Sequence, residues 1–178
     1  MHQNTAADAP AAAAFADGLG AEETRDIAEA LNGLFSDIFA LYLKTKNFHW
    51  YMTGPHFRDY HQMLGEQSAQ VFAMSDVLAE CVRKIGHLAL PSIGDIARKE
   101  RFKDNDALSA APREMLAELQ RDNGDLARSL REFHGMIPQQ NDGAAASVLE
   151  LYLDETERRA CCLDEARHAA LGVAPRAA

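Results

Sequence analysis

The chain has 178 residues, the length of one ordinary domain. Hydrophobic residues make up 47% and charged residues 25%, a globular composition that excludes wholesale disorder. The formal net charge of −9 provides no overall field that would draw the chain to nucleic acid or to an anionic membrane, and it suits the binding of cations.

The N-terminal residues 1–21 are rich in alanine and lack the basic region and continuous apolar core of a signal peptide. No segment approaches the roughly 20 apolar residues that span a bilayer. Cys81, Cys161 and Cys162 are too few and too badly spaced for a disulfide framework or a C-x-x-C metal site. The sequence therefore predicts a flexible arm over 1–21, thiols that are buried or idle, and a cytoplasmic protein with no membrane partner.

Helical periodicity then predicts four long helices. The first covers residues 22–51 and ends before Thr53-Gly54-Pro55. The second covers 57–85, and the third covers 112–135, with Pro112 as a favourable first residue. The fourth follows Asn141-Asp142-Gly143 and continues to about residue 170.

The order of these helices predicts the fold. No stretch alternates with a period of two residues, so we expect no sheet. The link over 86–111 is far longer than a normal connection, and its residues 92–98 suit one or two helical turns. Two hairpins joined by one long crossover describe an all-α, ferritin-like four-helix bundle. We expect this domain to span 22–170, followed by a short tail over 171–178.

Two histidines and two carboxylates suggest a metal site. His49 lies near the end of the first predicted helix, and His61 lies near the start of the second, across one short loop. Asp76 and Glu80 are four residues apart near the far end of the second helix, so they share one face. Imidazole and carboxylate together are a ligand set of iron, manganese or zinc.

These side chains cannot bind one ion within a single chain. His61 and Asp76 are separated on one helix by roughly 22 Å, at about 1.5 Å per residue. A di-iron centre inside a bundle usually needs a Glu-x-x-His pair on each of two helices, and only Glu165 and His168 form such a pair here. Two chains with antiparallel second helices would bring the histidines of one to the carboxylates of the other. The plainer alternative is an exposed histidine and a solvated acidic face.

A longer motif resembles the signature of the Dps family, the starvation-induced miniferritins. The segment from Leu43 to Trp50 (LKTKNFHW) is followed by the segment from Thr53 to Phe57 (TGPHF) and then by His61. Asp76 and Glu80 stand where that family has its second carboxylate pair.

The resemblance covers about residues 31–163 and implies a hollow dodecameric homo-oligomer that oxidises Fe(II) and stores Fe(III) as a mineral. The oxidant it implies is hydrogen peroxide in preference to dioxygen. It also implies ferroxidase centres at two-fold interfaces. There, Asp76 and Glu80 of one subunit and His49 of its neighbour hold the principal iron, and the neighbour's His61 serves a second, weaker position.

Gly65 departs from the family pattern. The family has an acidic residue, usually Asp, four positions after the second histidine, as a ligand of the weaker site, and this chain has Gly65 there. Glycine offers no ligand, and Glu66 points about 100° away around the helix. We therefore expect the principal site to persist, and the iron pair to form weakly or with water.

Trp50 and an acidic face on the fourth helix complete the candidate residues. In the family, an aromatic residue beside the centre is thought to intercept oxidising equivalents, a role that would fall to Trp50; the alternative is a core aromatic. Around a three-fold axis, an acidic face would form a carboxylate ring through which Fe(II) enters; the alternative is an ordinary solvated face. The residues of this face are Glu150, Asp154 and Glu157, with Asp142 at the mouth.

DNA binding is the main rival function. Many Dps proteins coat DNA through a tail rich in lysine and arginine, but this chain has neither residue before Arg25, and its last 13 residues offer only Arg167 and Arg176. The sequence favours an iron-oxidising assembly with weak, salt-sensitive DNA binding over a DNA-compacting assembly whose iron chemistry is weakened at Gly65. A third hypothesis is a purely structural shell or surface antigen with idle metal ligands.

Overall fold

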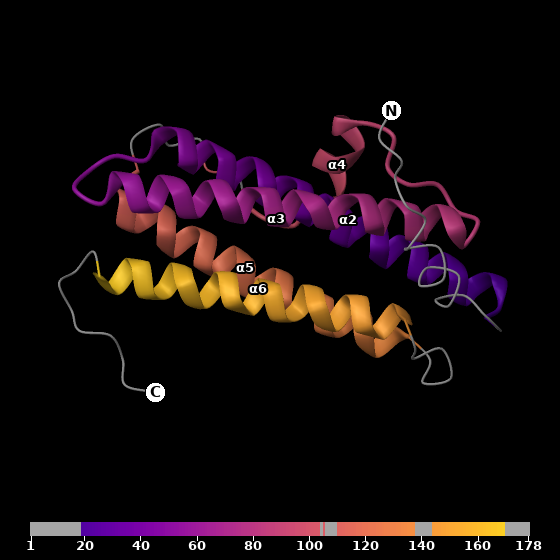
Figure 1. The fold of residues 1–178 in the computed structure, drawn as a ribbon. Coiled ribbons are helices and arrows are strands. Elements are labelled where there is room, and N and C mark those ends of the chain that lie inside the picture. The colour runs from indigo at the N-terminus through magenta and orange to yellow at the C-terminus, as the bar shows by residue number, and fades with distance from the viewer. Residues whose placement is uncertain (1–18, 104, 106–109, 138–143, 170–178) are drawn as a thin grey trace, which may run out of the picture.

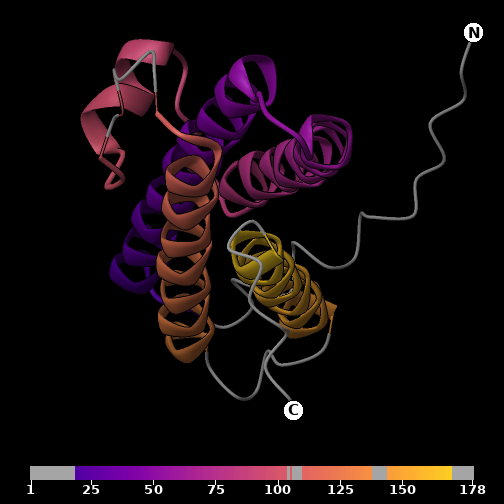
Figure 2. The same ribbon diagram turned by 90° about the vertical axis from the view of Figure 1, so that its left-hand side faces the viewer.

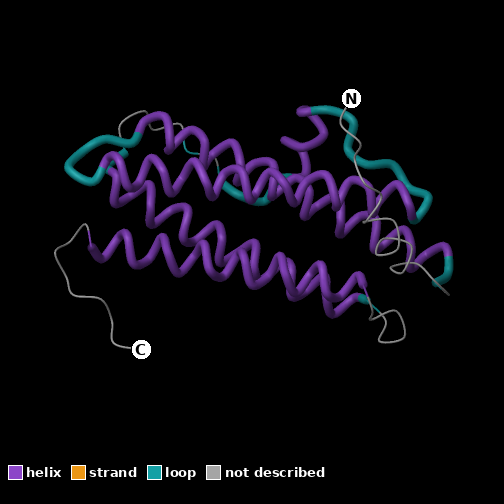
Figure 3. The backbone as a smooth tube through the Cα atoms, viewed as in Figure 1, coloured by secondary structure: helices purple, strands orange, loops and turns teal. Residues whose placement is uncertain are grey.

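The structure is a computed structural model that describes residues 19–103, 105, 110–137 and 144–169. Within those ranges, all the secondary structure is helical (Figure 3). The predicted arm and the predicted tail lie outside the described residues, except for residues 19–21. In chain order the helices are α2 (Ala21–Tyr51), α3 (Phe57–Lys84), α4 (Ile93–Lys99), α5 (Pro112–Met136) and α6 (Ala144–Ala169).

The predicted four-helix bundle is confirmed. The hairpins α2–α3 and α5–α6 form two layers (Figure 1), and an end-on view shows the four long helices gathered around one core (Figure 2). The crossover returns the chain along the bundle, so α3 and α5 run in the same direction. The loop that joins α2 to α3 therefore lies at the end of the bundle where α5 begins.

The helices begin and end at the sequence signals that predicted them. Gly54 and Gly86 have φ angles of 95° and 86°, a left-handed backbone that favours glycine, and they lie in the turns that follow α2 and α3. Pro112 is the first residue of α5. The Ser92 side chain accepts a hydrogen bond from the backbone N–H of Asp95 and caps α4, which is the helical turn predicted in the crossover.

The apolar stripes of the long helices meet in one core. Each large aliphatic side chain buried there contributes on the order of 1.5–3 kcal/mol relative to its exposed state. All four long helices contribute fully buried large side chains, among them Leu31, Leu34, Ile38, Leu41, Leu64, Met74, Leu78, Leu116, Leu119, Leu126, Phe133 and Leu163.

Buried polar groups attach the crossover to α2. The Asp37 carboxylate is 1% exposed and accepts hydrogen bonds from the backbone N–H of Arg101 at 3.0 Å and from its Nε at 2.8 Å. The Asn32 side chain donates to the carbonyl oxygen of Leu88 at 3.0 Å. These contacts hold the segment before α4 and the segment after it against the same helix.

The structure also shows the state of the cysteines and the polarity of the helices. All three cysteines are free, with Cys81 buried and with Cys161 and Cys162 exposed on α6. Over the described ranges, the structure contains no helix long and apolar enough to cross a membrane.

Candidate metal centre

The turn between α2 and α3 brings His49 and His61 into contact. Their ring centroids are 3.7 Å apart with an interplanar angle of 32°. The ring of Phe57 lies 5.1 Å from that of His61 and covers one side of the pair. The structure therefore joins the two histidines that the sequence placed on either side of a short loop.

A hydrogen bond fixes which nitrogen of His49 is free. The Nδ1 of His49 lies 2.7 Å from the carbonyl oxygen of His61. Because a carbonyl only accepts, Nδ1 carries the proton, and the Nε2 of neutral His49 keeps its lone pair. Burial lowers the pKa of His49 against the effect of this hydrogen bond, and the positive charge of Lys46 acts in the same direction as burial. The ring is thus held neutral, the form that binds a metal ion.

Gly65 of α3 packs closely against the His49 ring. A Cβ atom at this position would lie 3.2 Å from Cε1 and 3.4 Å from Nδ1 of His49, closer than ordinary van der Waals contact. The sequence indicated only that a carboxylate is absent here. The structure adds that the absence of any side chain makes room for the imidazole.

Asp76 and Glu80 lie on the exposed face of α3, near its other end. Glu80 forms an ion pair with Lys84 at 3.2 Å, one turn later on the same helix. Within the described part of the chain, no three His, Cys, Asp or Glu side chains lie close enough to hold a metal ion together. The histidine pair and the carboxylate pair are therefore two separate half-sites in a single chain.

His61 and the two carboxylates lie on one stripe of α3. His61, Gly65, Phe72, Asp76 and Glu80 are spaced by four, seven, four and four residues, which places them on one side of a helix. The stripe between the half-sites is apolar.

An aromatic cluster fills this interval. Phe72 is 42% exposed, and its ring centroid lies 4.7 Å from that of Tyr42 and 6.1 Å from that of Phe39. Phe35 extends the cluster along α2, with its ring 6.0 Å from that of Phe39. The α2–α3 hairpin consequently presents an aromatic surface, exposed at Phe72 and half-buried at its α2 residues, that separates imidazoles at one end from carboxylates at the other.

The other sequence candidates occupy the surface. Trp50 is 60% exposed, which rules out the alternative that it fills the core of the single chain. Glu150, Asp154 and Glu157 are all exposed on α6.

Two carboxylates of that acidic face have partners. Asp154 pairs with Arg158 of the same helix, and Glu157 pairs with Arg131 of α5. Asp142 lies outside the described residues. A carboxylate ring about a three-fold axis stays a prediction.

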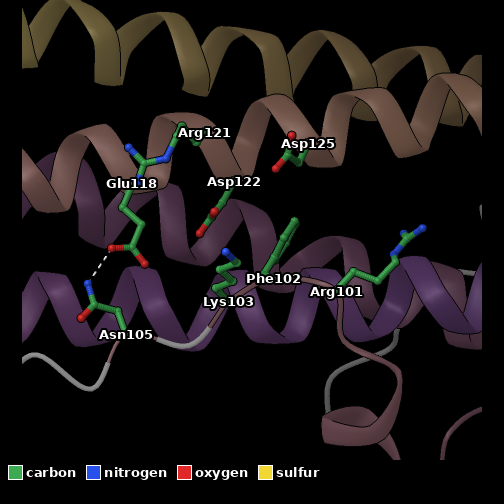
Figure 4. Close-up of a pocket in the computed structure, with 8 residues that line it drawn as sticks. All are labelled: Arg101, Phe102, Lys103, Asn105, Glu118, Arg121, Asp122 and Asp125. Carbon is green, nitrogen blue, oxygen red and sulfur yellow. Dashed lines mark hydrogen bonds between the residues drawn. The ribbon is translucent and has the colours of Figure 1, made fainter.

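A polar pocket that the sequence did not reveal lies between α5 and the crossover (Figure 4). It has a volume of about 490 Å³. Two of the lining residues contact Nζ of Lys44 on α2: Asp122 at 2.8 Å and Glu118 at 3.0 Å. Burial raises the pKa of Asp122 against the effect of Lys44. For Lys44, burial lowers the pKa, but the two carboxylates outweigh it and the pKa is raised.

These contacts satisfy the carboxylates of the pocket without a metal. Asn105 of the crossover also donates to Glu118, as the dashed line in Figure 4 shows. The cluster therefore ties α2, α5 and the crossover together. Lys44 and Asp122 are 78 residues apart in the chain, so no local pattern could have predicted the pair.

Comparison with known proteins gives the family. The sequence profile of the ferritin-like domain family matches residues 28–166. The chain is 29% identical over 152 residues to the DNA protection during starvation protein of Halobacterium salinarum, covering 84% of this chain and 79% of that protein. It is 30% identical over 115 residues to an uncharacterized low temperature-induced protein of Nostoc, covering 65% of this chain and 64% of that protein's length.

Solved structures share the fold. The crystal structure of an archaeal Dps homologue from Halobacterium salinarum gives a TM-score of 0.77 at 27% identity, over 85% of this chain and 84% of that chain. The structure of DpsC from Streptomyces coelicolor gives a TM-score of 0.80 at 19% identity, over 92% of this chain and 94% of that one, and is similar in fold alone. The matched domain, the shared bundle and the motif around His49 place this chain in the Dps family of ferritin-like proteins.

Proposed function

We propose that this protein is a homo-oligomeric miniferritin, a dodecamer, that oxidises Fe(II) at centres shared between two subunits and stores the Fe(III) inside the assembly. One observation carries the proposal: the histidine pair and the carboxylate pair are complementary ligand sets that lie at opposite ends of the aromatic surface of the α2–α3 hairpin. Two-fold packing of α3 against α3 in antiparallel orientation joins each histidine pair to the partner's carboxylate pair and creates two identical centres.

The side chains suit this chemistry. Asp76 and Glu80 supply oxygen ligands, and the lone pair on Nε2 of His49 supplies the nitrogen ligand of the principal iron. His61 serves the weaker position, where Gly65 leaves water in place of a carboxylate. Two Fe(II) ions each give one electron to hydrogen peroxide, which takes up two protons and leaves as two molecules of water. Trp50, exposed beside His49, is suited to intercept a stray oxidising equivalent.

The direct test is an anaerobic Fe(II) titration of the purified assembly, followed by a sub-stoichiometric addition of hydrogen peroxide and optical detection of Fe(III). The wild type oxidises iron rapidly, and the Asp76→Ala/Glu80→Ala variant falls to the rate of free iron. A Glu29→Ala/Glu132→Ala variant is the matched control, because it removes the same charge from exposed positions on α2 and α5. Equal rates in the wild type and the Asp76/Glu80 variant would exclude the proposed centre.

Mixed assemblies test whether the centre is shared. One chain carries His49→Ala and His61→Ala, and the other carries Asp76→Ala and Glu80→Ala; each alone is inactive. Equal amounts of the two chains are unfolded together and reassembled. Random pairing then makes half of the dimers mixed, and each mixed dimer has one intact centre and one inactive centre. Activity therefore returns to about a quarter of the wild-type level. A centre within one chain would give no recovery.

We further propose that Fe(II) enters through the acidic face formed by Glu150, Asp154 and Glu157 at a three-fold axis. All three carboxylates are exposed, and the arginine partners of Asp154 and Glu157 are themselves at the surface, so both ion pairs are weak in water. Replacement of Glu150 and Asp154 by alanine should slow iron uptake, while the peroxide reaction of iron already bound keeps its rate.

DNA protection appears in the printed names of several relatives, including those from Halobacterium salinarum and Deinococcus radiodurans. For this chain we propose only weak DNA binding, because a net charge of −9 opposes association with phosphate. Retention of DNA in a gel-shift experiment should therefore be confined to low salt.

A further inference from the structure

A buried arginine without a carboxylate partner lies in the bundle core. Arg159 of α6 is 2% exposed. Its Nε donates to Oδ1 of Asn123 at 3.0 Å, and its Nη2 donates to Oγ1 of Thr156 at 2.7 Å. Nη2 also lies 3.7 Å from the sulfur of Met74. The remaining nitrogen, Nη1, is buried and has no hydrogen-bond partner among the described residues.

This guanidinium carries an uncompensated charge. Burial lowers the pKa of Arg159 to about 10, and the through-space attraction of Glu155 opposes that effect without forming an ion pair. A buried cation with a free donor is costly unless a counter-charge and an acceptor are supplied. The described part of the bundle supplies no carboxylate that contacts Arg159 and no acceptor for its Nη1.

A second unpaired group lies on the same pocket. Oε1 of Gln67 on α3 is buried without a partner. Gln67 and Arg159 both line a pocket of about 210 Å³ between α3 and α6. Long unbranched side chains form most of its remaining wall. Because Nη1 and Oε1 are both buried, an ion in the pocket reaches them only when some of these side chains rotate aside. The other lining residues are Met63, Glu66, Gln70, Glu155, Arg158 and Cys162.

We propose that this pocket binds a small oxyanion that also carries a hydroxyl group, held between Nη1 of Arg159 and Oε1 of Gln67. The anion supplies the missing counter-charge and accepts from Nη1, and its hydroxyl group donates to the amide oxygen of Gln67. The carboxylates of Glu66 and Glu155 beside the pocket disfavour a dianion, so the ligand is a monoanion. Dihydrogen phosphate and hydrogencarbonate have this chemistry, whereas sulfate lacks the hydroxyl group.

The site is independent of the proposed iron centre. Its residues are not ligands of either half-site, and anion binding is measured on iron-free protein. Loss of ferroxidase activity would therefore leave this proposal intact, and absence of anion binding would leave the iron centre intact.

The test is calorimetric titration of the iron-free assembly with inorganic phosphate, hydrogencarbonate and sulfate in separate experiments. We expect phosphate or hydrogencarbonate to bind saturably, and the anion that binds more tightly is the ligand that the pocket prefers. Arg159→Met weakens that binding by about tenfold or more, the value of one charged hydrogen bond. Gln67→Met weakens it several-fold. Arg128→Met, which removes an exposed arginine on α5, leaves it unchanged.

A loss of anion binding can be distinguished from a folding defect in these variants. Replacing an uncompensated buried cation by an apolar side chain of similar length is often neutral or stabilising, and thermal melting with size-exclusion chromatography verifies the fold and the assembly of each variant. Binding that is absent in the wild type, or equal in the wild type and Arg159→Met, would overturn the proposal. Sulfate binding as tight as that of phosphate would overturn the role of the hydroxyl group.

Discussion

Gly65 shows how one residue changes both the ligands and the packing of a site. Its missing side chain removes an oxygen ligand from the family pattern, and the His49 ring occupies the space above it. In the proposed iron centre, a substitution at this position would act through the position of His49 as well as through the ligand that it adds.

We expect alanine at the two helical glycines Gly65 and Gly124 to have different effects. At Gly124 of α5 nothing lies within 4 Å of a new Cβ, so Gly124→Ala should stabilise by about 0.5–1 kcal/mol and raise Tm by roughly 1–4 °C. At Gly65 the Cβ meets His49 at 3.2 Å, which offsets that gain. Thermal melting of the two variants checks this, and equal increases would show that His49 moves aside without cost.

Cys81 provides a test of burial at a single residue. Burial raises the pKa of its thiol to about 11, so very little thiolate is present at pH 8. In a Cys161→Ser/Cys162→Ser variant, native protein should show no fast-reacting thiol, and denaturation should release one equivalent. A thiol reagent with optical detection measures both states, and rapid reaction of the native variant would contradict the assigned burial.

At the level of the elements, a buried carboxylate is one of the groups that attach the crossover to α2. Arg101 supplies Asp37 with both a backbone and a side-chain donor. The crossover is therefore attached to α2 at Asp37. The long helices were predictable because a period of 3.6 residues is visible in any short window. The Asp37–Arg101 contact spans 64 residues and leaves no such pattern.

Arg101→Ala should destabilise the protein by about 1–3 kcal/mol, because Asp37 then loses charged hydrogen bonds in a buried place. Arg98→Ala is the control. It breaks an exposed i,i+3 pair with Asp95 in α4 and should cost less than about 0.5 kcal/mol. Denaturant unfolding of the two variants separates them, and similar losses would show that the Asp37 contact adds nothing beyond a surface pair.

For the whole molecule, the proposed two-fold packing makes the aromatic surface of the α2–α3 hairpin the contact between subunits. Phe72 lies at its centre, between the two half-sites. Burial of one such side chain against a partner is worth about 1.5–3 kcal/mol, and two-fold symmetry counts it twice.

Phe72→Glu should therefore yield smaller particles without ferroxidase activity, with helix content unchanged because the side chain is exposed in the single chain. Light scattering after size-exclusion chromatography measures the mass. Leu88→Glu, at a crossover position that is 77% exposed, is the control and should assemble as the wild type does. A wild-type mass for Phe72→Glu would place the interface on another surface.

The sequence by itself determined the four helices and the long crossover with its helical turn, and it predicted two candidate ligand pairs that no single chain can join. These are properties of local periodicity, of capping residues and of distance along one helix. The tertiary structure alone decided the rest: the contact between His49 and His61, the fit of that ring over Gly65, the Lys44 cluster, and the unpaired guanidinium of Arg159. Each of these joins residues from different turns or helices, and only packing fixes where such side chains meet.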